Sequence, residues 1–520
     1  MQRRKRILSL LLAVVMVVGL SQAGVLTNGL LLRASAETVS GTCGASGNVY
    51  DVRWTLDKDS GVLTISGTGA MKDYYSGTAP WTKFCDLIKT VSIGSGVTKL
   101  GDYAFYNCTS LASVTIPDSV TQIGDSAFEN CTCITDMTIP SGVKHLGSSA
   151  FSKCTGLTNL TFNAVKCTIL HSNNDNYYAF TDCTALQTVT FGETVETIPA
   201  EILFCCPGLR TVTILPGVKE IGRAAFCYCA NLADVNMSDS VTRIGDYAFS
   251  GCTSLTHMNV GNGVTEIGYS AFSLCSSLTR VTLGNAVETI GYSAFAKSPL
   301  TGIFIPRSVR EIGQDAFSCG IRTDEYDLNT GYGIIPTLQT IEVDPDNAYY
   351  CVRDGVLFNK AQTVLIQYPN ADPRTEYLIP NGVTDVGDDD FYYCTNLKSV
   401  HVPFSVNSIG SDAFTGCSSL IYICSDFADN YYTRYIADQN GFEFRLCDGH
   451  GSPARVPGDA NGDGVLDLKD VIRIRRFLAG GWNVTLIESA SDVDADRAVT
   501  LQDAVLILRS LAGGWDVTLQ

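Results

Sequence analysis

Apolar and polar positions alternate in a pattern that repeats every 23 residues along most of the chain. One repeat, residues 108–130, reads C-x-x-L-x-x-V-x-I-P-x-x-V-x-x-I-G-x-x-A-F-x-x. Its first apolar stripe predicts a short strand with one buried face, ended by Pro117; the stripe consists of Leu111, Val114 and Ile116. A second stripe on the return side consists of Val120, Ile123, Ala127 and Phe128, and Gly124 is expected to allow a bend there.

Ala-Phe pairs locate the same repeat elsewhere in the chain. Their phenylalanines are 23 residues apart within two runs: Phe105, Phe128 and Phe151, and then Phe226, Phe249, Phe272 and Phe295. A single unit cannot bury both of its apolar stripes, so neighbouring units must stack and share strand hydrogen bonds. The pattern therefore predicts an α/β, right-handed solenoid with a parallel β-sheet and short helical or irregular return segments.

These repeats resemble the BspA-like bacterial leucine-rich-repeat family, whose units carry the motif I-P-x-x-V-x-x-I-G-x-x-A-F-x-x-C. The resemblance runs from about Leu87 to Cys424. It includes one degenerate unit, in which Pro199 replaces the glycine and Leu203 replaces the phenylalanine. The family relationship implies a solenoid domain at residues 87–447.

The same resemblance implies capped ends and one insertion. Residues 37–86 are expected to form an N-terminal β cap, with strands at 54–56 and 62–67. A hairpin insertion is expected within residues 344–368, and a closing helix and strand at 431–437 and 441–444.

A different kind of sequence follows Cys447. Residues 448–457 form a linker that contains Gly and Pro but has no apolar periodicity. Residues 458–520 hold two loop–helix units related by a constant offset of 33 residues, so that Asp459 in the first unit corresponds to Asp492 in the second. Oxygen ligands fall at loop positions 1, 3, 5, 9 and 12, and a backbone carbonyl can fill position 7, which is EF-hand calcium spacing. We therefore expect two Ca2+ ions, held by Asp459, Asn461, Asp463, Val465, Asp467 and Asp470 in the first loop and by Asp492, Asp494, Asp496, Ala498, Thr500 and Asp503 in the second. Arg497 stands where the first loop has Gly464, so the second site is expected to be weaker.

Residues 458–520 resemble a type I dockerin, which is a small all-α, duplicated EF-hand-like domain. The resemblance rests on the aspartate at loop position 12, on the single helix that follows each loop, and on the short length of the segment. The resemblance implies a cohesin module on a scaffold protein as the partner. By the same resemblance, the partner-contacting positions are Leu468, Lys469, Arg475 and Arg476 in the first half, and Leu501, Gln502, Leu508 and Arg509 in the second. The Ser-Thr pair found in many dockerins is absent, which leaves the identity of the cohesin open.

The chain has 20 cysteines, and half of them occupy one repeat position, three residues after the phenylalanine or its replacement. They are Cys108, Cys131, Cys154, Cys183, Cys206, Cys229, Cys252, Cys275, Cys394 and Cys417. We interpret them as a ladder of buried free thiols, where a serine would lose packing and strand its hydroxyl. Disulfides near the caps are the alternative, with Cys43–Cys85 or Cys424–Cys447 as candidates. Metal binding or nucleophilic chemistry is third, because no C-x-x-C pair or Cys-His spacing supports it.

The first residues predict export. Residues 1–36 combine a basic start, a short apolar run from position 7 to 20 and an A-x-A cleavage site, which is typical of a signal peptide and leaves no transmembrane segment in the mature protein. The formal net charge of −17 argues against nucleic acid as a partner. We expect a secreted protein associated with the cell surface through a scaffold.

The function predicted from these parts is non-catalytic binding or adhesion, with an unknown protein or glycan ligand on the solenoid. Threonines on the strand faces (Thr115, Thr138, Thr161, Thr190, Thr213 and Thr282) and loops at residues 171–178 and 320–336 are candidate contact regions. Two alternatives remain: a dockerin-borne glycan-degrading enzyme or accessory, and a purely structural surface component. The repeat leaves no room for a separate catalytic domain, and no residue is predicted to be catalytic.

Overall fold

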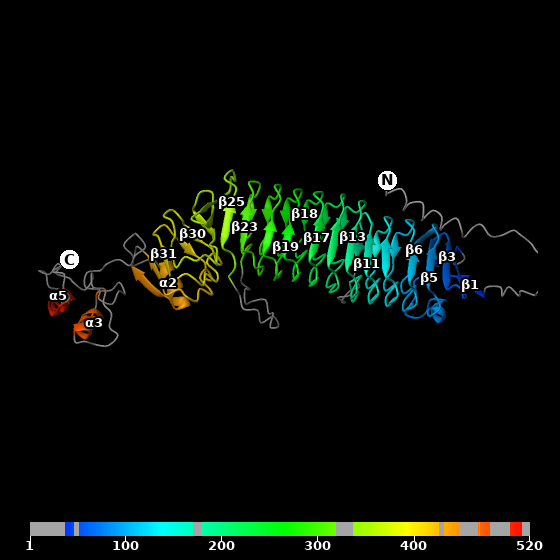
Figure 1. The fold of residues 1–520 in the computed structure, drawn as a ribbon, viewed down its shortest axis with the longest axis horizontal. Helices are drawn as coiled ribbons and strands as arrows, with labels where there is room; N and C mark the ends of the chain where they lie inside the picture. Colours follow the sequence, from blue (N-terminus) through cyan, green and yellow to red (C-terminus); the bar gives the residue numbers. More distant parts are fainter. Residues whose placement is uncertain are drawn as a thin grey trace, which may run out of the picture.

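The computed structural model describes residues 37–45, 51–169, 178–318, 336–425, 431–446, 466, 468–478 and 500–511. The predicted signal peptide, both predicted contact loops except Tyr178 and Pro336, and two thirds of each calcium loop lie outside these residues. The described chain forms an elongated solenoid whose coils follow one another in sequence order from the N-terminal cap to the C-terminal cap (Figure 1). The predicted parallel-sheet solenoid is confirmed.

One side of the solenoid is built from the strand of the L-x-x-V-x-I segment. Within a sheet, such a strand pairs in parallel with the equivalent strand of the next coil, as in the register Leu160↔Val189 between β11 and β13. The strands form four sheets along this side: β1 (Thr38–Thr42), β2 (Val52–Asp57), β3 (Val62–Gly67), β5 (Thr90–Ile93) and β7 (Ser113–Thr115); β9 (Asp136–Ile139), β11 (Asn159–Phe162), β13 (Thr188–Phe191), β15 (Thr211–Ile214) and β17 (Asp234–Met237); β19 (His257–Asn259), β21 (Arg280–Thr282), β23 (Gly302–Ile305) and β25 (Thr340–Val343); β29 (Glu376–Leu378), β31 (Ser399–Val402), β33 (Tyr422–Ser425) and β34 (Glu443–Leu446).

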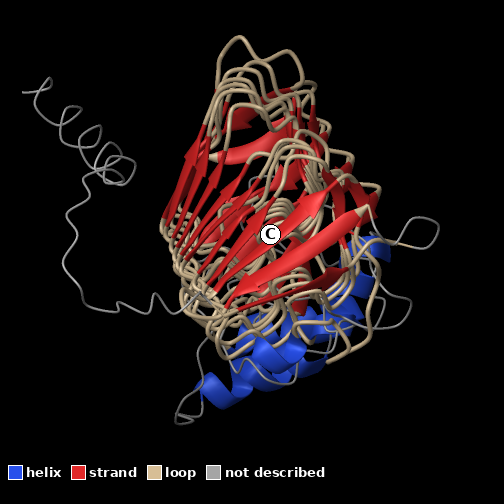
Figure 2. Ribbon diagram, turned by 90° about the vertical axis from the view of Figure 1, so that its right-hand side faces the viewer, coloured by secondary structure: helices blue, strands red, loops and turns tan. Residues whose placement is uncertain are grey.

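The return segments differ from the prediction of helical or irregular structure, because they form strands as well. Most of these strands have two residues, one of them the buried isoleucine or leucine of the V-x-x-I segment, and they pair in parallel from coil to coil. The sheets are β4 (Gly69–Ala70), β6 (Val97–Leu100), β8 (Gln122–Ile123), β10 (His145–Leu146) and β12 (Thr168–Ile169); β14 (Thr197–Ile198), β16 (Glu220–Ile221), β18 (Arg243–Ile244), β20 (Glu266–Ile267), β22 (Thr289–Ile290) and β24 (Glu311–Ile312); and β26 (Tyr350–Arg353), β27 (Val356–Asn359), β28 (Val364–Gln367), β30 (Asp385–Val386) and β32 (Ser408–Ile409). Seen along the solenoid, the strands occupy separate sides and loops close the corners (Figure 2).

The Ala-Phe segment forms the turn that closes each coil. Backbone φ is positive on both sides of the phenylalanine, for example 49° at Ser126 and 61° at Asn130. The phenylalanine between them is fully buried and stacks on its equivalents: the Phe128 and Phe151 rings are 5.0 Å apart and 5° from parallel. Each turn is therefore fixed by ring stacking and by backbone hydrogen bonds to the next coil, such as the one that the Phe128 amide donates to Ala150 C=O at 2.7 Å.

The glycine after the isoleucine has a different role from the predicted one. Gly124 does not have a positive φ, but a Cβ at this position would lie 2.6 Å from the backbone nitrogen of Asp102 in the preceding coil. Coil-to-coil contact, rather than backbone flexibility, thus requires glycine here. In the degenerate unit, where Pro199 replaces it, the return-side sheet is interrupted, and β12 and β14 belong to different sheets.

The ladder cysteines are buried, as predicted, and each points at the coil before it. The Sγ atom of Cys252 donates to the carbonyl of Phe226 at 3.3 Å, and that of Cys275 to the carbonyl of Phe249 at 3.2 Å. Ser298 occupies the same position and donates its hydroxyl to Phe272 C=O at 2.7 Å. The expectation that a serine would strand its hydroxyl here is therefore wrong, because the turn supplies a fixed carbonyl acceptor.

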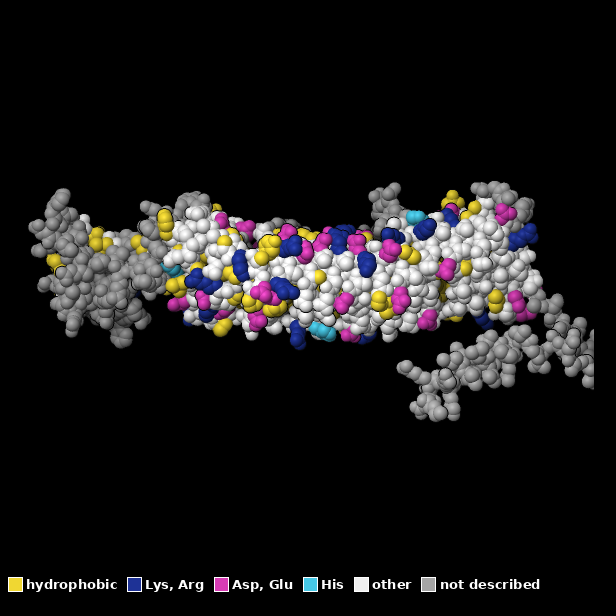
Figure 3. Space-filling view, turned by 90° about the horizontal axis from the view of Figure 1, so that it is seen from above, with side chains coloured by type: hydrophobic (Ala, Val, Ile, Leu, Met, Phe, Trp, Pro, Cys, Tyr) yellow, Lys and Arg dark blue, Asp and Glu magenta, His cyan; other side chains and the backbone are white. Residues whose placement is uncertain are grey.

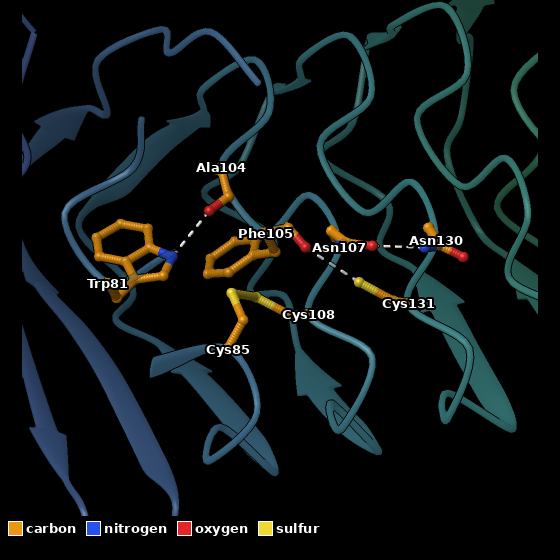
Figure 4. Close-up of a disulfide and its surroundings, with 8 residues drawn as sticks. All are labelled: Trp81, Cys85, Ala104, Phe105, Asn107, Cys108, Asn130 and Cys131. Atoms are coloured by element: carbon orange, nitrogen blue, oxygen red, sulfur yellow. Dashed lines mark hydrogen bonds between the residues drawn. A yellow bond between two sulfur atoms is a disulfide. The ribbon is translucent and has the colours of Figure 1, made fainter. Parts of the chain in front are cut away.

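The N-terminal cap covers the first coil. The indole of Trp81 packs against Phe105, 5.6 Å away, and donates from Nε1 to the carbonyl of Ala104 at 2.8 Å (Figure 4). A 3-10 helix, η1 (Thr82–Phe84), precedes Cys85, which forms a disulfide with Cys108 (Figure 4). Two predictions are thus wrong: Cys108 is not a free thiol, and Cys85 does not pair with Cys43, because the cap places Cys85 at the ladder position beside Cys108.

The solenoid core is divided at the hairpin insertion. One apolar cluster runs from the N-terminal cap to Tyr350 and Leu357 of the insertion, and a second runs from Val356 and Phe358 to the C-terminal cap. The insertion consists of the antiparallel strands β26, β27 and β28, in the segment for which a hairpin was expected. At the other end, α2 (Tyr431–Asn440) packs against β33 and β34. Cys424 is disulfide-bonded, and its candidate partner Cys447 lies outside the described residues.

Candidate functional site

The described part of the C-terminal segment consists of two helices, α3 (Leu468–Leu478) and α5 (Leu501–Leu511), which pack on each other. Their bounds are related by the same offset as the two predicted calcium loops. The buried residues of their interface obey this offset too, since Val471 corresponds to Ala504 and Ile474 to Ile507. The two halves therefore contribute equivalent faces to one small core.

Only two of the predicted calcium ligands are described with their side chains. Asp470, at position 12 of the first loop, lies in the first turn of α3 and is fully buried, and Thr500 immediately precedes α5. The side chain of Asp503 and the remaining predicted ligands lie outside the described residues, so the calcium sites stay predictions. Elsewhere in the described chain, no group of three or more His, Cys, Asp or Glu residues is placed to hold a metal ion.

The predicted partner-contacting residues lie on the outside of this helix pair where they are described. Leu468 and Leu501, equivalent by the same offset, are 60% and 61% exposed, and Leu508, Lys469 and Arg475 are exposed as well. The side chains of Arg476, Gln502 and Arg509 lie outside the described residues.

The predicted threonine face exists as a regular ladder. Thr138, Thr161, Thr190 and Thr213 follow one another in register on β9, β11, β13 and β15. On the face of the molecule seen in Figure 3, Lys and Arg side chains lie interspersed with Asp and Glu side chains.

A groove that the sequence did not predict lies along the Ala-Phe turns. It has a volume of about 520 Å3 and extends over six coils, from the degenerate unit to the turn at Phe317, with Tyr178 and Asp389 beyond its two ends. Its floor consists of small buried side chains at the positions two before and one after the phenylalanine: Ala224, Cys227, Ser250, Ser270, Ser273 and Ala296. We call this feature the turn groove.

Aromatic rings stand along the turn groove. Tyr247, Tyr269 and Tyr292 come from three successive coils, with ring centroids 5.1 and 5.2 Å apart. Phe204 and Tyr228 continue the aromatic lining toward the degenerate unit, with centroids 5.8 Å apart. Tyr228 is 49% and Tyr269 is 37% exposed, so the rings present apolar surface and hydroxyl groups to solvent.

The charged residues of the turn groove lie at its two ends. Arg223 forms a 2.6 Å ion pair with Glu201 and lies over the ring of Tyr247, 5.9 Å from its centroid. Lys297, Asp315 and Asp389 line the opposite end. The middle of the groove is lined by uncharged side chains, and the Oγ atoms of Ser250 and Ser273 are hydrogen-bonded to each other at 2.9 Å.

A signal for this groove was present in the sequence. The segments Gly-Tyr-Ser-Ala-Phe at 268–272 and 291–295 have tyrosine where the earlier repeats have Asp125 or Ser148. The other aromatic residues stand at different repeat positions, Tyr247 two before and Tyr228 two after a phenylalanine. The folded turn brings the segments before and after the phenylalanine to one surface, and only there do these aromatic residues lie together.

The buried cysteines are poor nucleophiles. Burial raises the pKa of Cys229 and Cys275 to about 12, and the pKa of Cys227, which lines the turn groove, to about 11. These thiols therefore carry a proton at neutral pH, whereas nucleophilic attack requires the thiolate.

One carboxyl group has a pKa suited to acid–base chemistry. Burial raises the pKa of Asp390 to about 7, and nearby Asp315 and Asp388 contribute. Asp390 accepts the backbone N–H of Gly387 and is buried among the turns that follow the hairpin insertion. This hydrogen bond within the turn explains why Asp390 is buried there, so no bound substrate is needed to explain its position.

The repeats of the chain match a known family of bacterial repeat proteins. The family model described as BspA type leucine-rich repeat region matches six times, over residues 82–203, 164–275, 203–324 and 370–434, which together cover more than half of the chain. No curated protein matches. No described helix is long and apolar enough to cross a membrane.

Solved structures with a similar fold come from several bacteria. A leucine-rich cell surface protein from Faecalibacterium prausnitzii is 24% identical, with 72% of this chain and 87% of that chain covered and a TM-score of 0.42. A leucine-rich repeat protein from Bacteroides ovatus is 20% identical, with 76% and 98% covered and a TM-score of 0.42. A leucine-rich repeat protein from T. pallidum is 24% identical, with 39% and 88% covered and a TM-score of 0.27.

Proposed function

Because this chain belongs to the BspA type leucine-rich repeat region family, we propose that it is a secreted, non-catalytic binding protein that a calcium-dependent C-terminal module attaches to a scaffold. Repeat solenoids present long surfaces suited to protein or ligand binding. In this proposal the solenoid holds the ligand, and the dockerin-like segment at residues 458–520 holds a cohesin module at the cell surface.

One observation carries the docking part of the proposal. A single constant offset relates the helix bounds, the buried pairs Val471/Ala504 and Ile474/Ile507, and the exposed pair Leu468/Leu501. A duplicated helix with one shared core and two equivalent apolar surfaces is suited to a partner that binds either half. The predicted loop ligands fit Ca2+, because they are hard oxygen donors at EF-hand spacing.

The proposed role of calcium is to fold the module. Carboxylates gathered in an empty loop repel one another, and a bound divalent ion would neutralise them and hold the start of each helix. Asp470 fits this role, since it is a loop ligand by sequence and lies buried in the first turn of α3.

Calorimetric titration of the chelator-treated full chain with CaCl2 tests this role. We expect two bound ions, and the double variant Asp463→Ala/Asp496→Ala should bind neither. The matched control is Asp59→Ala, which removes an exposed carboxylate in the N-terminal cap, far from the module along the chain. Absence of calcium binding by the unaltered chain would refute the proposed module.

The two halves are expected to dock unequally. The first half offers Lys469, Arg475 and Arg476, whereas the second offers Gln502, Leu508 and Arg509. Charge differences of this kind alter partner choice and association rate. With an acidic cohesin surface, changing the first triplet to alanine should weaken calcium-dependent binding much more than changing the second. Equal losses, measured by calorimetry, would exclude a preferred orientation.

A further inference from the structure

The turn groove combines three features that point to one class of ligand: a polar, uncharged middle, aromatic rings at the coil spacing, and a floor of small side chains. We propose that it binds a linear, uncharged oligosaccharide along the solenoid axis. The inference deepens the proposed binding function of the solenoid by naming the ligand class, and it does not depend on the calcium-dependent module.

The chemistry of the lining matches that of a sugar chain. A pyranose has apolar C–H surfaces and a rim of hydroxyl groups. Tyr269 and Tyr292 offer apolar ring surface with a polar tip. The Ser250 and Ser273 hydroxyls are hydrogen-bonded to each other, and Ser273 also donates to Ser270 C=O, so they contribute acceptor lone pairs to the floor. A purely apolar ligand would cover the exposed Tyr269 hydroxyl without replacing its hydrogen bonds to water, which costs free energy.

The spacing of the lining also matches a repeating ligand. Each coil adds one ring, and the centroids of Tyr247, Tyr269 and Tyr292 are 5.1 and 5.2 Å apart. An extended β-linked glycan advances by a similar distance for each sugar. A short chain of sugars lying along the groove would therefore meet one tyrosine ring for each sugar at Tyr247, Tyr269 and Tyr292.

A peptide is a less suitable occupant, because the groove offers little backbone for it to pair with. The amides of Tyr247 and Ser270 already donate to Tyr269 and Tyr292 in the next coil, at 2.8 and 2.9 Å. On the other side of the phenylalanine, the Tyr228 amide donates to Ser250 at 2.7 Å. Extended peptides usually gain affinity by adding a strand to unpaired backbone.

The distribution of charged side chains in the turn groove also favours an uncharged sugar chain. The ion pair of Arg223 with Glu201 closes one end of the groove, and Lys297, Asp315 and Asp389 lie at the other, so no single sign dominates. Nucleic acids and anionic glycans select surfaces with an excess of basic side chains. The uncharged middle of the groove thus favours a neutral sugar chain.

Isothermal titration calorimetry of the full chain with β-1,4-linked hexasaccharides of glucose, xylose and mannose tests the proposal. We expect at least one of the three to bind, and Tyr269→Ala to weaken that binding at least tenfold. A second variant, Ser273→Tyr, fills the floor with the residue that Tyr106 supplies at the same repeat position, so the fold should accept it.

Two matched controls should keep full affinity. Tyr75→Ala removes an 83% exposed tyrosine outside the groove, and Ser152→Tyr makes the floor-filling change in a coil that the groove does not reach. Circular dichroism checks that each variant is folded. Sugar binding should persist in excess chelator, whereas cohesin binding should be lost, which separates failure of this proposal from failure of the docking module.

Three results would overturn the proposal. The unaltered chain does not bind any of the three saccharides at millimolar concentration; both groove variants bind as well as the unaltered chain; or an uncharged extended hexapeptide binds in the groove in place of the sugars. The last result would identify a peptide as the occupant.

Discussion

Replacing Cys252 with serine should cost little stability, although the residue is fully buried in the middle of the solenoid. Its thiol donates to Phe226 C=O at 3.3 Å, and that carbonyl also accepts the amide of Cys229 at 3.2 Å. A serine hydroxyl can make the same bond, as Ser298 does at 2.7 Å one coil beyond Cys275. The substitution then only exchanges a semi-apolar sulfur for a hydrogen-bonded hydroxyl, and we expect it to lower the free energy of unfolding by about 1 kcal/mol.

Two further substitutions at Cys252 separate the effect of losing the hydrogen-bond donor from the effect of burying a carboxyl group. Cys252→Ala removes the donor and leaves a small void, at about 1–2 kcal/mol. Cys252→Asp buries a carboxyl group among apolar turns, and should cost more than about 3 kcal/mol. The reciprocal control, Ser298→Cys, restores the residue found in most coils and should be close to neutral.

The measurement must allow for the array unfolding in parts, because coils contact mainly their neighbours. We suggest thermal unfolding of the full chain by circular dichroism, combined with hydrogen exchange at the Phe249 amide, which donates to Ala271 C=O at 2.8 Å. The expected order of destabilisation is serine, alanine, aspartate. If Cys252→Ser proves as damaging as Cys252→Asp, the turn carbonyl does not accept the serine hydroxyl and the reasoning fails.

Three more outcomes are expected. Cys154, Cys229 and Cys275, whose pKa burial raises to about 12, should leave stability unaffected below about pH 9 and lower it as the pH rises from about 9 toward 12. A thiol in the unfolded chain, with its ordinary pKa of 9.0, loses its proton first, so rising pH favours the unfolded state, and serine variants should flatten the alkaline denaturation profile. Brief alkylation of the native protein, read by mass mapping, should modify the exposed Cys133 and Cys205 well before the ladder thiols, and equal rates would contradict the ladder. Phe249→Ala should cost about 3–5 kcal/mol in thermal unfolding, while Phe249→Leu should cost clearly less because Leu203 fills the same position in the degenerate coil; similar losses would refute stacking as the stabilising contact.

The aromatic and cysteine positions show which structural features the sequence of a single repeat determines. The 23-residue pattern was sufficient to predict the strand of each coil, the stacking of coils and the burial of the cysteine ladder. It even identified Leu203 as a phenylalanine substitute, and this side chain is fully buried. These features follow from apolar spacing within one unit, which every neighbouring unit repeats.

Other features depend on contacts between coils, and tertiary structure alone decided them. Cys85 stands 23 residues before Cys108, at the ladder position of the first repeat, but only the folded cap shows that it bonds to Cys108 rather than to Cys43. The close approach of neighbouring backbones, rather than a bend, requires Gly124. The turn groove arises because the closing turn places residues before and after each phenylalanine on one surface, where Tyr228 and Tyr269 join a single lining. Sequence spacing determines what one coil buries, but the surface that several coils share depends on how their turns stack in space.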